Sequence, residues 1–418
     1  MATYPTLIAE VAFGAAPGTE YLLLNDTLRG KLDTAQLAPD DWYADVSGDL
    51  MKVVIDRGRQ RRLEQYRASR ATIDLRDANA DYDPNNLAGQ YVSAGITQVE
   101  AMRRARLRAT YGAITYPLFG GYTDDWVPDR SNELSRVMVL SASGGMKVLA
   151  NFDPDASAPT GTGEDSGARI TRVLNNAGYP TNDRVIDVGN STLQATTLAQ
   201  NALTECYLTA DSEGGAFYEL ADGRLNFDRR RAIYEDTRMR DSQATFDNVS
   251  GLPFTGLTPR NDAELVKNDI RLARTGGTTQ TAFDAASQAK YLKRSLRRTD
   301  LLLETDTEVD LLTDWHLYNA KDREVRFDEI VLDPVMNDAL WPVVLGLELR
   351  SRVTVVDRPR GMSAVTKDCF VEGIKHMIVP PLVWKTTLRL SSATPFTGMF
   401  ILDHATLGKL DTGILATF

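Results

Sequence analysis

Apolar and polar residues alternate with a period of two through most of residues 50–143, and this alternation constrains the fold more than any other feature. In the segment SRATIDLRD, Ala71, Ile73 and Leu75 fall on one face of a strand, and polar residues fall on the other. RARLRATYG and LSRVMVLSAS repeat the pattern. Strands with one apolar face stack as sandwiches or close into barrels. We therefore predict an antiparallel β domain here.

The period changes after this region. NFDPDASAPTGTGEDSG is rich in turn-forming residues, SGARITRVLNNAGYP has helical spacing, and GAFYELADGRLNFDRR predicts a hairpin that turns at Asp222 and Gly223. Strand patterns resume after Gly256. We predict a mainly β, α+β fold with two antiparallel β-barrel-type domains. The expected order is an N-terminal arm (1–36), a first barrel (37–150), a linker (151–165), an α+β insert (166–255), a second barrel with one inserted helix (256–394) and a C-terminal docking arm (395–418).

Three helix signals refine this division. Ser166 is a plausible N-cap for the first helix of the insert, and a second helix is expected over residues 201–210, ahead of Gly214 and Gly215. The helix expected within the second barrel has Thr307 and Asp310 at the spacing of a capping-box variant.

The composition is that of a soluble globular protein, with 43% hydrophobic and 25% charged residues. No apolar run approaches the ~20 residues of a membrane helix, and the first residues lack the basic stretch of a signal peptide, so synthesis in the cytoplasm is expected. Cys206 and Cys369 lie far apart outside any Cys-x-x-Cys motif, so we expect two buried thiols. The net charge of −10 argues against a nucleic-acid-binding surface.

Residues that could carry chemistry do not form a recognisable motif. DANADYDPNN resembles the start of an EF-hand loop, but Tyr82 and Ala88 occupy the positions that need Gly and Glu, so an Asx-rich turn is the better interpretation. His316, His376 and His404 lack metal-ligand spacing and are interpreted as structural. We predict no catalytic residue, metal or cofactor, although the sequence leaves a catalytic carboxylate pair open.

The phrase Gly-Lys-Leu-Asp-Thr occurs near both ends of the 418-residue chain, at residues 30–34 and 408–412. An apolar tripeptide precedes each copy by a few residues, which argues against chance. The spacing is unlike that of stacked tandem repeats.

Several stretches resemble minor tail proteins of phages with long, non-contractile tails. VVIDRGRQRRLEQYRASRATIDLRDANADYDPNN looks like the amino-terminal part of that family, ADSEGGAFYELADGRLNFDRR is similar to its helix-to-hairpin unit, and VEGIKHMIVPPLVWKTTLRLS resembles the closing strands of tail hub proteins. The matching structural residues include Arg57, Gly58, Arg59, Asp83, Pro84, Asn85, Gly214, Gly215, Asp222, Gly223 and Trp384.

The resemblance implies a virion protein of the distal tail tip, part of a baseplate hub ring that continues or closes the tail tube. Expected partners are the chain itself as a homotrimer, the distal tail and other minor tail proteins, and the tape measure protein. Genomic DNA would pass without specific binding, through a neutral or acidic lumen. The alternatives are a receptor- or carbohydrate-binding adhesin module and a tail-associated cell-wall hydrolase.

The repeated phrase is interpreted in this setting as a pair of docking segments. Each leucine would insert into a pocket on a partner, and each glycine would permit a tight turn. The residues assigned to docking are Gly30, Leu32, Asp33, Gly408, Leu410 and Asp411.

Overall fold

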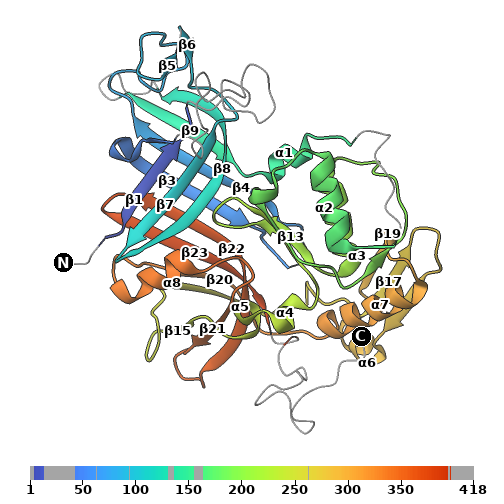
Figure 1. Ribbon diagram of the computed structural model, residues 1–418. Coiled ribbons are helices and arrows are strands. Elements are labelled where there is room, and N and C mark those ends of the chain that lie inside the picture. Colours follow the sequence, from blue (N-terminus) through green and yellow to red (C-terminus); the bar gives the residue numbers. More distant parts are fainter. Residues whose placement is uncertain are drawn as a thin grey trace.

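A 13-stranded sheet runs through both halves of the chain in the computed structural model (Figure 1). Its strand order is β16-β20-β23-β22-β3-β4-β9-β8-β7-β1-β2, with β21 paired to β22 and β15 paired to β21. The structure describes residues 4–13, 43–62, 64–93, 95–129, 136–154, 163–261, 263–393 and Phe396. The mainly β, α+β fold class predicted from the sequence is confirmed.

Most strands of the large sheet come from the two regions that were predicted to form barrels, but β1 lies in the predicted N-terminal arm and β15 in the predicted α+β insert. They are β1 (Thr6–Val11), β2 (Ala44–Asp45), β3 (Leu50–Gly58), β4 (Arg67–Arg76), β7 (Arg104–Tyr111), β8 (Ile114–Asp129), β9 (Val137–Ser143), β15 (Thr245–Asp247), β16 (Gly256–Arg260), β20 (Arg326–Leu332), β21 (Arg352–Asp357), β22 (Val365–Val379) and β23 (Val383–Ser392).

The two halves are joined by the antiparallel pair β3 and β22, whose register runs from Gly58 opposite Gly373 to Val53 opposite Ile378. Among the described residues the terminal strands of the sheet, β16, β2 and the branch strand β15, do not pair with one another, so the sheet is not a closed barrel. The division into two antiparallel barrel-type domains stays a prediction. Alternation predicts that a strand has one buried face, but it does not say which strand is its neighbour.

The predicted face of β4 is correct, because Ala71, Ile73 and Leu75 are each at most 2% exposed. Within the predicted N-terminal arm, Thr6–Val11 forms β1 and pairs antiparallel with β7 along six residues. Residues 14–36 of that arm lie outside the described residues. A two-stranded sheet of β5 (Val92–Ser93) and β6 (Ile96–Thr97) lies apart from the main one.

The middle of the chain forms a module of helices and short strands beside β4 and β8 (Figure 1). Its hairpin turns at Asp222 and Gly223, as predicted. The module contains α1 (Met146–Ala150), β10 (Glu164–Asp165), α2 (Ser166–Asn176), β11 (Arg184–Ile186), β12 (Thr192–Leu193), α3 (Ala202–Glu213), β13 (Ala216–Glu219), β14 (Leu225–Asp228), α4 (Ala232–Glu235) and α5 (Thr237–Arg240).

The N-cap of α2 is Asp165 and not the predicted Ser166. Asp165 has an extended backbone, and its carboxylate accepts a hydrogen bond from the Ala168 N–H at 2.8 Å. The Ser166 hydroxyl instead donates to Glu213. The expected second helix is α3, which ends at Gly214 in the left-handed conformation with a φ of 76°.

A third unit consists of a three-stranded sheet covered by a helix. Its elements are β17 (Asp269–Arg274), β18 (Gln280–Phe283), α6 (Ala285–Tyr291), β19 (Ser295–Leu301) and α7 (Asp306–Ala320). The capping box of α7 uses Thr305 and Glu308, two residues before the predicted Thr307 and Asp310. Thr305 is the residue with extended backbone at the helix start, so its hydroxyl, and not that of Thr307, reaches the free N–H of the first turn.

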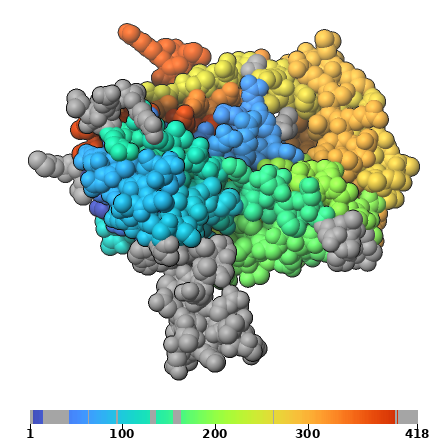
Figure 2. Space-filling model, turned by 90° about the horizontal axis from the view of Figure 1, so that it is seen from above, coloured from blue at the N-terminus to red at the C-terminus, as the bar shows by residue number. Residues whose placement is uncertain are grey.

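Figure 2 shows the first-half strands at one end of the molecule and this third unit at the other, with the middle module between them. The remaining helices are short: α8 (Trp341–Gly346) and the 3-10 turns Ser47–Asp49, Thr181–Asp183 and Asp338–Leu340. The main hydrophobic core extends along the large sheet and into the middle module, and a second core lies between the third unit and the end of β23.

Candidate functional site

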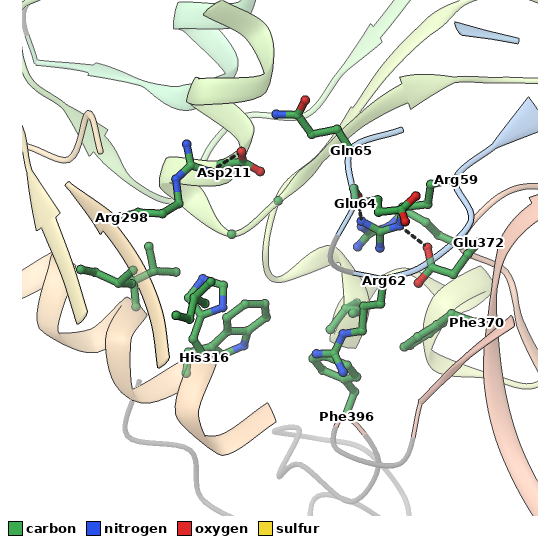
Figure 3. A pocket seen from close by; sticks show the side chains of 18 of the residues that line it. Arg59, Arg62, Glu64, Gln65, Asp211, Arg298, His316, Phe370, Glu372 and Phe396 are labelled. Atoms are coloured by element: carbon green, nitrogen blue, oxygen red, sulfur yellow. Dashed lines mark hydrogen bonds and ion pairs between the residues drawn. The ribbon is translucent and has the colours of Figure 1, made fainter. Parts of the chain in front are cut away.

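A cavity of about 410 Å³ lies where the large sheet, the middle module and the third unit meet. The loop after β3 and strand β22 form one wall, and β17, β19 and α7 form the other (Figure 3). Gly214 and Gly215 of the middle module also line it. A volume of this size lies within the range of ligand pockets.

The segment Arg57-Gly58-Arg59 builds the first wall. Gly58 has a φ of 96°, and a side chain there would collide with the carbonyl oxygen of Glu372, so only glycine fits. Arg57 is 3% exposed and forms an ion pair of 2.7 Å with Glu348. Arg59 forms an ion pair of 2.7 Å with Glu372 on β22. The predicted family-matching segment therefore ties the end of β3 to the second half of the chain.

Glu372 is a buried carboxylate that is fully supplied with donors. Its Oε2 accepts hydrogen bonds from Arg59 Nε and the Tyr66 hydroxyl, both at 2.7 Å, and its Oε1 accepts one from the Ser391 hydroxyl at 2.5 Å. Burial alone would raise the pKa of Glu372, but the charge of Arg59 and these hydrogen bonds lower it to about 2. The group is thus held ionised as part of the wall.

Phe396 closes one side of the cavity. Its ring lies 5.7 Å from that of Phe370, 6.1 Å from Trp315 and 6.2 Å from Tyr234, measured between ring centroids. The guanidinium of Arg62 lies over the same ring at 4.6 Å. Figure 3 shows Arg62 directed toward Phe396 and away from the Arg59 and Glu372 pair.

A second cavity of about 70 Å³ adjoins the first and shares Arg62 and His316 with it. Asn319 is 7% exposed and lines this smaller cavity, and neither polar atom of its amide has a hydrogen-bond partner in the part of the chain that the structure describes. His316 and Asn319 are three residues apart on α7 and therefore share a face. Burial lowers the pKa of His316 to about 3, so its imidazole is neutral at physiological pH.

Arg62 is the cation that both cavities share. Arg62 makes a long contact of 3.5 Å with the Asn319 carbonyl oxygen, and no carboxylate of the described chain lies within ion-pair distance of it. Burial lowers the pKa of Arg62 to about 10, which is still far above neutral pH. Among the described residues, no group of three or more potential metal-ligating side chains is present.

The other predicted turn residues lie away from the cavity. Asp83 is 8% exposed, and its Oδ1 accepts from the Asn85 N–H at 3.0 Å, with Pro84 between them in an Asx turn. Gly223 has a φ of 89° at the turn of the β13–β14 hairpin, where the side chain of Asp222 accepts from the Arg224 N–H. Trp384 is fully buried and packs edge-on against Trp341 at 5.1 Å.

The structure thus brings Arg59, Gly214 and Gly215 together at the cavity and places the remaining turns elsewhere. Sequence reasoning missed Arg62, Glu372, Asn319 and Phe396, and it treated His316 as a satisfied structural histidine. Within the described chain the His316 ring makes no hydrogen bond, whereas His376 contacts the Thr386 hydroxyl at 2.9 Å. One pattern in the sequence could have indicated this site. His316 and Asn319 are polar residues three positions apart on a helix face that is otherwise apolar.

The predicted docking residues Gly30, Leu32, Asp33, Gly408, Leu410 and Asp411 lie outside the described residues, as does His404. Both cysteines are free and buried, as predicted. Among the described residues, none of the helices combines the length and apolar character required to cross a membrane.

The fold is shared with tail proteins of known structure. The 43 kDa tail protein of prophage MuSo2 from Shewanella oneidensis superimposes with a TM-score of 0.56 at 11% sequence identity, covering 94% of this chain and 98% of that protein. A tail protein from Neisseria meningitidis MC58 gives a TM-score of 0.55 at 14% identity, covering 92% and 96%. No protein-family model and no curated protein sequence matches the chain.

Proposed function

We propose that this chain is a structural component of a phage-type tail. The observation that carries the proposal is the fold, which is shared with two tail proteins along nearly the whole length of each. A likeness that covers all three parts of the chain, including the middle module, points to a common architecture and not to one widespread domain. One continuous sheet joins both halves of the chain and would form a rigid wall that contacts neighbouring subunits.

The finer proposal is a subunit of the tail-tip hub ring, at the distal end of a long, non-contractile tail. Two strand-rich halves in one chain would let a homotrimer match the sixfold symmetry of a tail tube. The distal tail protein, other minor tail proteins and the tape measure protein would be its neighbours. The sequence resemblance around Arg57-Gly58-Arg59 supports this placement, because that segment forms the junction between the two halves.

DNA passage during ejection is part of this proposal. The chain has a net charge of −10, and a wall of that sign would not retain the phosphate backbone, whose attraction to basic surfaces is strong and independent of sequence. We expect the lumen-facing surface of the ring to be neutral or acidic. A positively charged lumen in the assembled ring would contradict this part of the proposal.

Immunogold labelling tests the placement. Purified tailed particles would be labelled with an antibody against this chain and imaged, and gold confined to the distal tip is expected. Gold along the whole tube would contradict the hub position and indicate a tube protein, and gold on side fibres would indicate an adhesin. Particles without gold would remove the structural role. A symmetry-resolved reconstruction of the tip would then count the copies, of which three are expected.

The two alternative functions, an adhesin module and a cell-wall hydrolase, each predict a feature that can be tested. A carbohydrate-binding adhesin would present an exposed aromatic platform, but the four tryptophans within the described chain, Trp126, Trp315, Trp341 and Trp384, are each at most 9% exposed. A cell-wall hydrolase would clear purified cell wall in a zymogram. We expect no clearing, and a cleared zone would replace the structural proposal with the enzymatic one.

A further inference from the structure

The cavity beside Arg62 has the features of a peptide-binding cleft that nothing in the described chain fills. Among the described residues, Arg62 has no carboxylate partner, and the amide of Asn319, whose side chain is 7% exposed, has neither a donor nor an acceptor opposite it. Buried polar groups without partners are costly and rare, so these groups indicate a ligand with complementary groups. A carboxylate suits the guanidinium, and a peptide group, which both donates and accepts, suits the carboxamide.

The wall that carries Arg62 also carries an acidic residue. Glu64 lines the same cavity, and its buried Oε2 has no hydrogen-bond partner among the residues described, although the exposed Arg67 lies 3.6 Å away. Arg62 and Glu64 are two positions apart. The cleft therefore offers a cation and an anion side by side on one wall.

The opposite wall is apolar. Leu272 on β17, Leu296 on β19 and Leu312 on α7 face the cavity together with Trp315. An extended peptide in such a cleft places alternate side chains toward opposite walls. The best match is a tripeptide with a basic residue, a leucine and an acidic residue in order, because its outer side chains would face Glu64 and Arg62 while its leucine faced the apolar wall.

We propose that the cleft binds the segment Gly-Lys-Leu-Asp-Thr of a second copy of this chain. The sequence contains this phrase twice, at residues 30–34 and 408–412, and both lie outside the described residues. The lysine pairs with Glu64, the leucine packs on the leucine wall, the aspartate pairs with Arg62 and a peptide group bonds to Asn319. The inference rests on the proposed function, because only an assembly of several copies brings such a segment from one chain to another.

Fluorescence anisotropy with a labelled peptide tests the cleft on the purified, full-length chain. The protein carries Asp33→Asn and Asp411→Asn, so that its own phrases cannot compete. The probe is acetyl-Gly-Lys-Leu-Asp-Thr-Gly-amide, and the matched control peptide has Asn in place of Asp. We expect saturable binding of the probe and binding of the control at least ~10-fold weaker, since a charge-assisted hydrogen bond is lost.

Three variants separate the cleft from the general surface. Arg62→Ala should abolish the preference for Asp over Asn. Arg61→Ala, at the neighbouring arginine that pairs with Glu264 outside the cavity, should leave binding unchanged. Asn319→Leu should weaken binding while the melting temperature stays equal or rises, because a buried amide without partners is removed.

Equal binding of both peptides, no saturable binding, or binding unaffected by Arg62→Ala would overturn the proposal. The measurement uses the isolated chain, so its outcome is independent of whether the protein occupies a tail-tip ring. Peptide binding together with gold labelling away from the tail tip would support the cleft proposal and contradict the hub proposal. Gold labelling at the tip without peptide binding would support the hub proposal and contradict the cleft proposal.

Discussion

Gly120 and Gly223 lie backbone against backbone, where the turn of the β13–β14 hairpin rests on strand β8. A Cβ atom added at Gly223 would lie 2.7 Å from the carbonyl carbon of Gly120, and one added at Gly120 would collide with the carbonyl of Asp222. Glu348 supports the same junction, because its Oε2 accepts from the Ala221 N–H at 2.7 Å while its Oε1 pairs with Arg57. The middle module is thus seated on the large sheet through main-chain contact.

Gly120→Ala is expected to destabilise the protein by about 1–3 kcal/mol, because the added methyl group overpacks a contact made only of backbone atoms that cannot rotate away. Urea unfolding measures the change. Gly48→Ala is the matched control, since no atom of the described residues lies within 4 Å of an added Cβ there and its φ is not positive. Equal unfolding midpoints for the two variants would show that the contact between Gly120 and the hairpin accommodates a methyl group without loss of stability.

Arg59→Ala is expected to cost about 3–5 kcal/mol, because it leaves the Glu372 carboxylate buried without its cationic partner. Thermal unfolding at neutral pH is the measurement. The double variant Arg59→Ala with Glu372→Gln should recover part of the loss, since no unpaired charge then remains. A double variant less stable than the single one would show that Arg59 acts through packing and not through its charge.

Acid should remove the contribution of Glu372 to stability. Its pKa is lowered to about 2 in the folded protein, below the ordinary value of 4.5, so the stabilisation is complete above pH 4.5 and is lost as the pH falls from there toward 2. Glu372→Gln should therefore flatten the dependence of the unfolding free energy on pH in this window. Urea titrations between pH 2.5 and 6 compare the slopes, and parallel curves for the two proteins would contradict the assignment.

Thr305→Ala should destabilise the protein by about 1 kcal/mol, because it removes the hydroxyl that accepts from the Glu308 N–H at the start of α7. Thr307→Ala serves as the control, since Thr307 lies within the first turn and is exposed. Chemical unfolding of both variants gives the comparison. A larger loss of unfolding free energy for Thr307→Ala than for Thr305→Ala would show that Thr307 is the N-cap, as the sequence predicted.

Cys206 and Cys369 should remain unlabelled by a thiol reagent under native conditions. Burial raises the pKa of both thiols, that of Cys369 to about 12, so the reactive thiolate is scarce and shielded. Absorbance after addition of an aromatic disulfide reports the number of accessible thiols. Two should appear on denaturation, and prompt labelling of the folded protein would contradict the burial of these side chains.

Local features were predictable where residues close together in sequence determine the structure. The buried face of β4 follows from alternation, and the hairpin at Asp222 and Gly223 follows from a turn residue that must adopt a positive φ. The start of α7 was misplaced by two residues because Thr305 and Thr307 are both credible caps. Only the backbone conformation distinguishes between them.

Long-range features were not predictable from one sequence. The pairing of β3 with β22 places Arg57 opposite Ile374, and nothing in either segment identifies the other as its neighbour. The cavity is harder still, since Arg62, Asn319 and Phe396 come from three distant segments. In the sequence, each of these residues is typical of an ordinary surface or core position. Only the folded structure places the three side chains around the adjoining cavities.

The pairing of β3 with β22 also determines how the protein can be made. Arg59 and Glu372 are 313 positions apart, so a ribosome adding ~5–20 residues per second delivers β22 roughly 15 to 60 s after β3. During that interval one edge of β3 has no strand to pair with, and such edges recruit other chains. The nascent N-terminal half must therefore be shielded, or must fold slowly, until β22 (Val365–Val379) leaves the ribosome and pairs with β3.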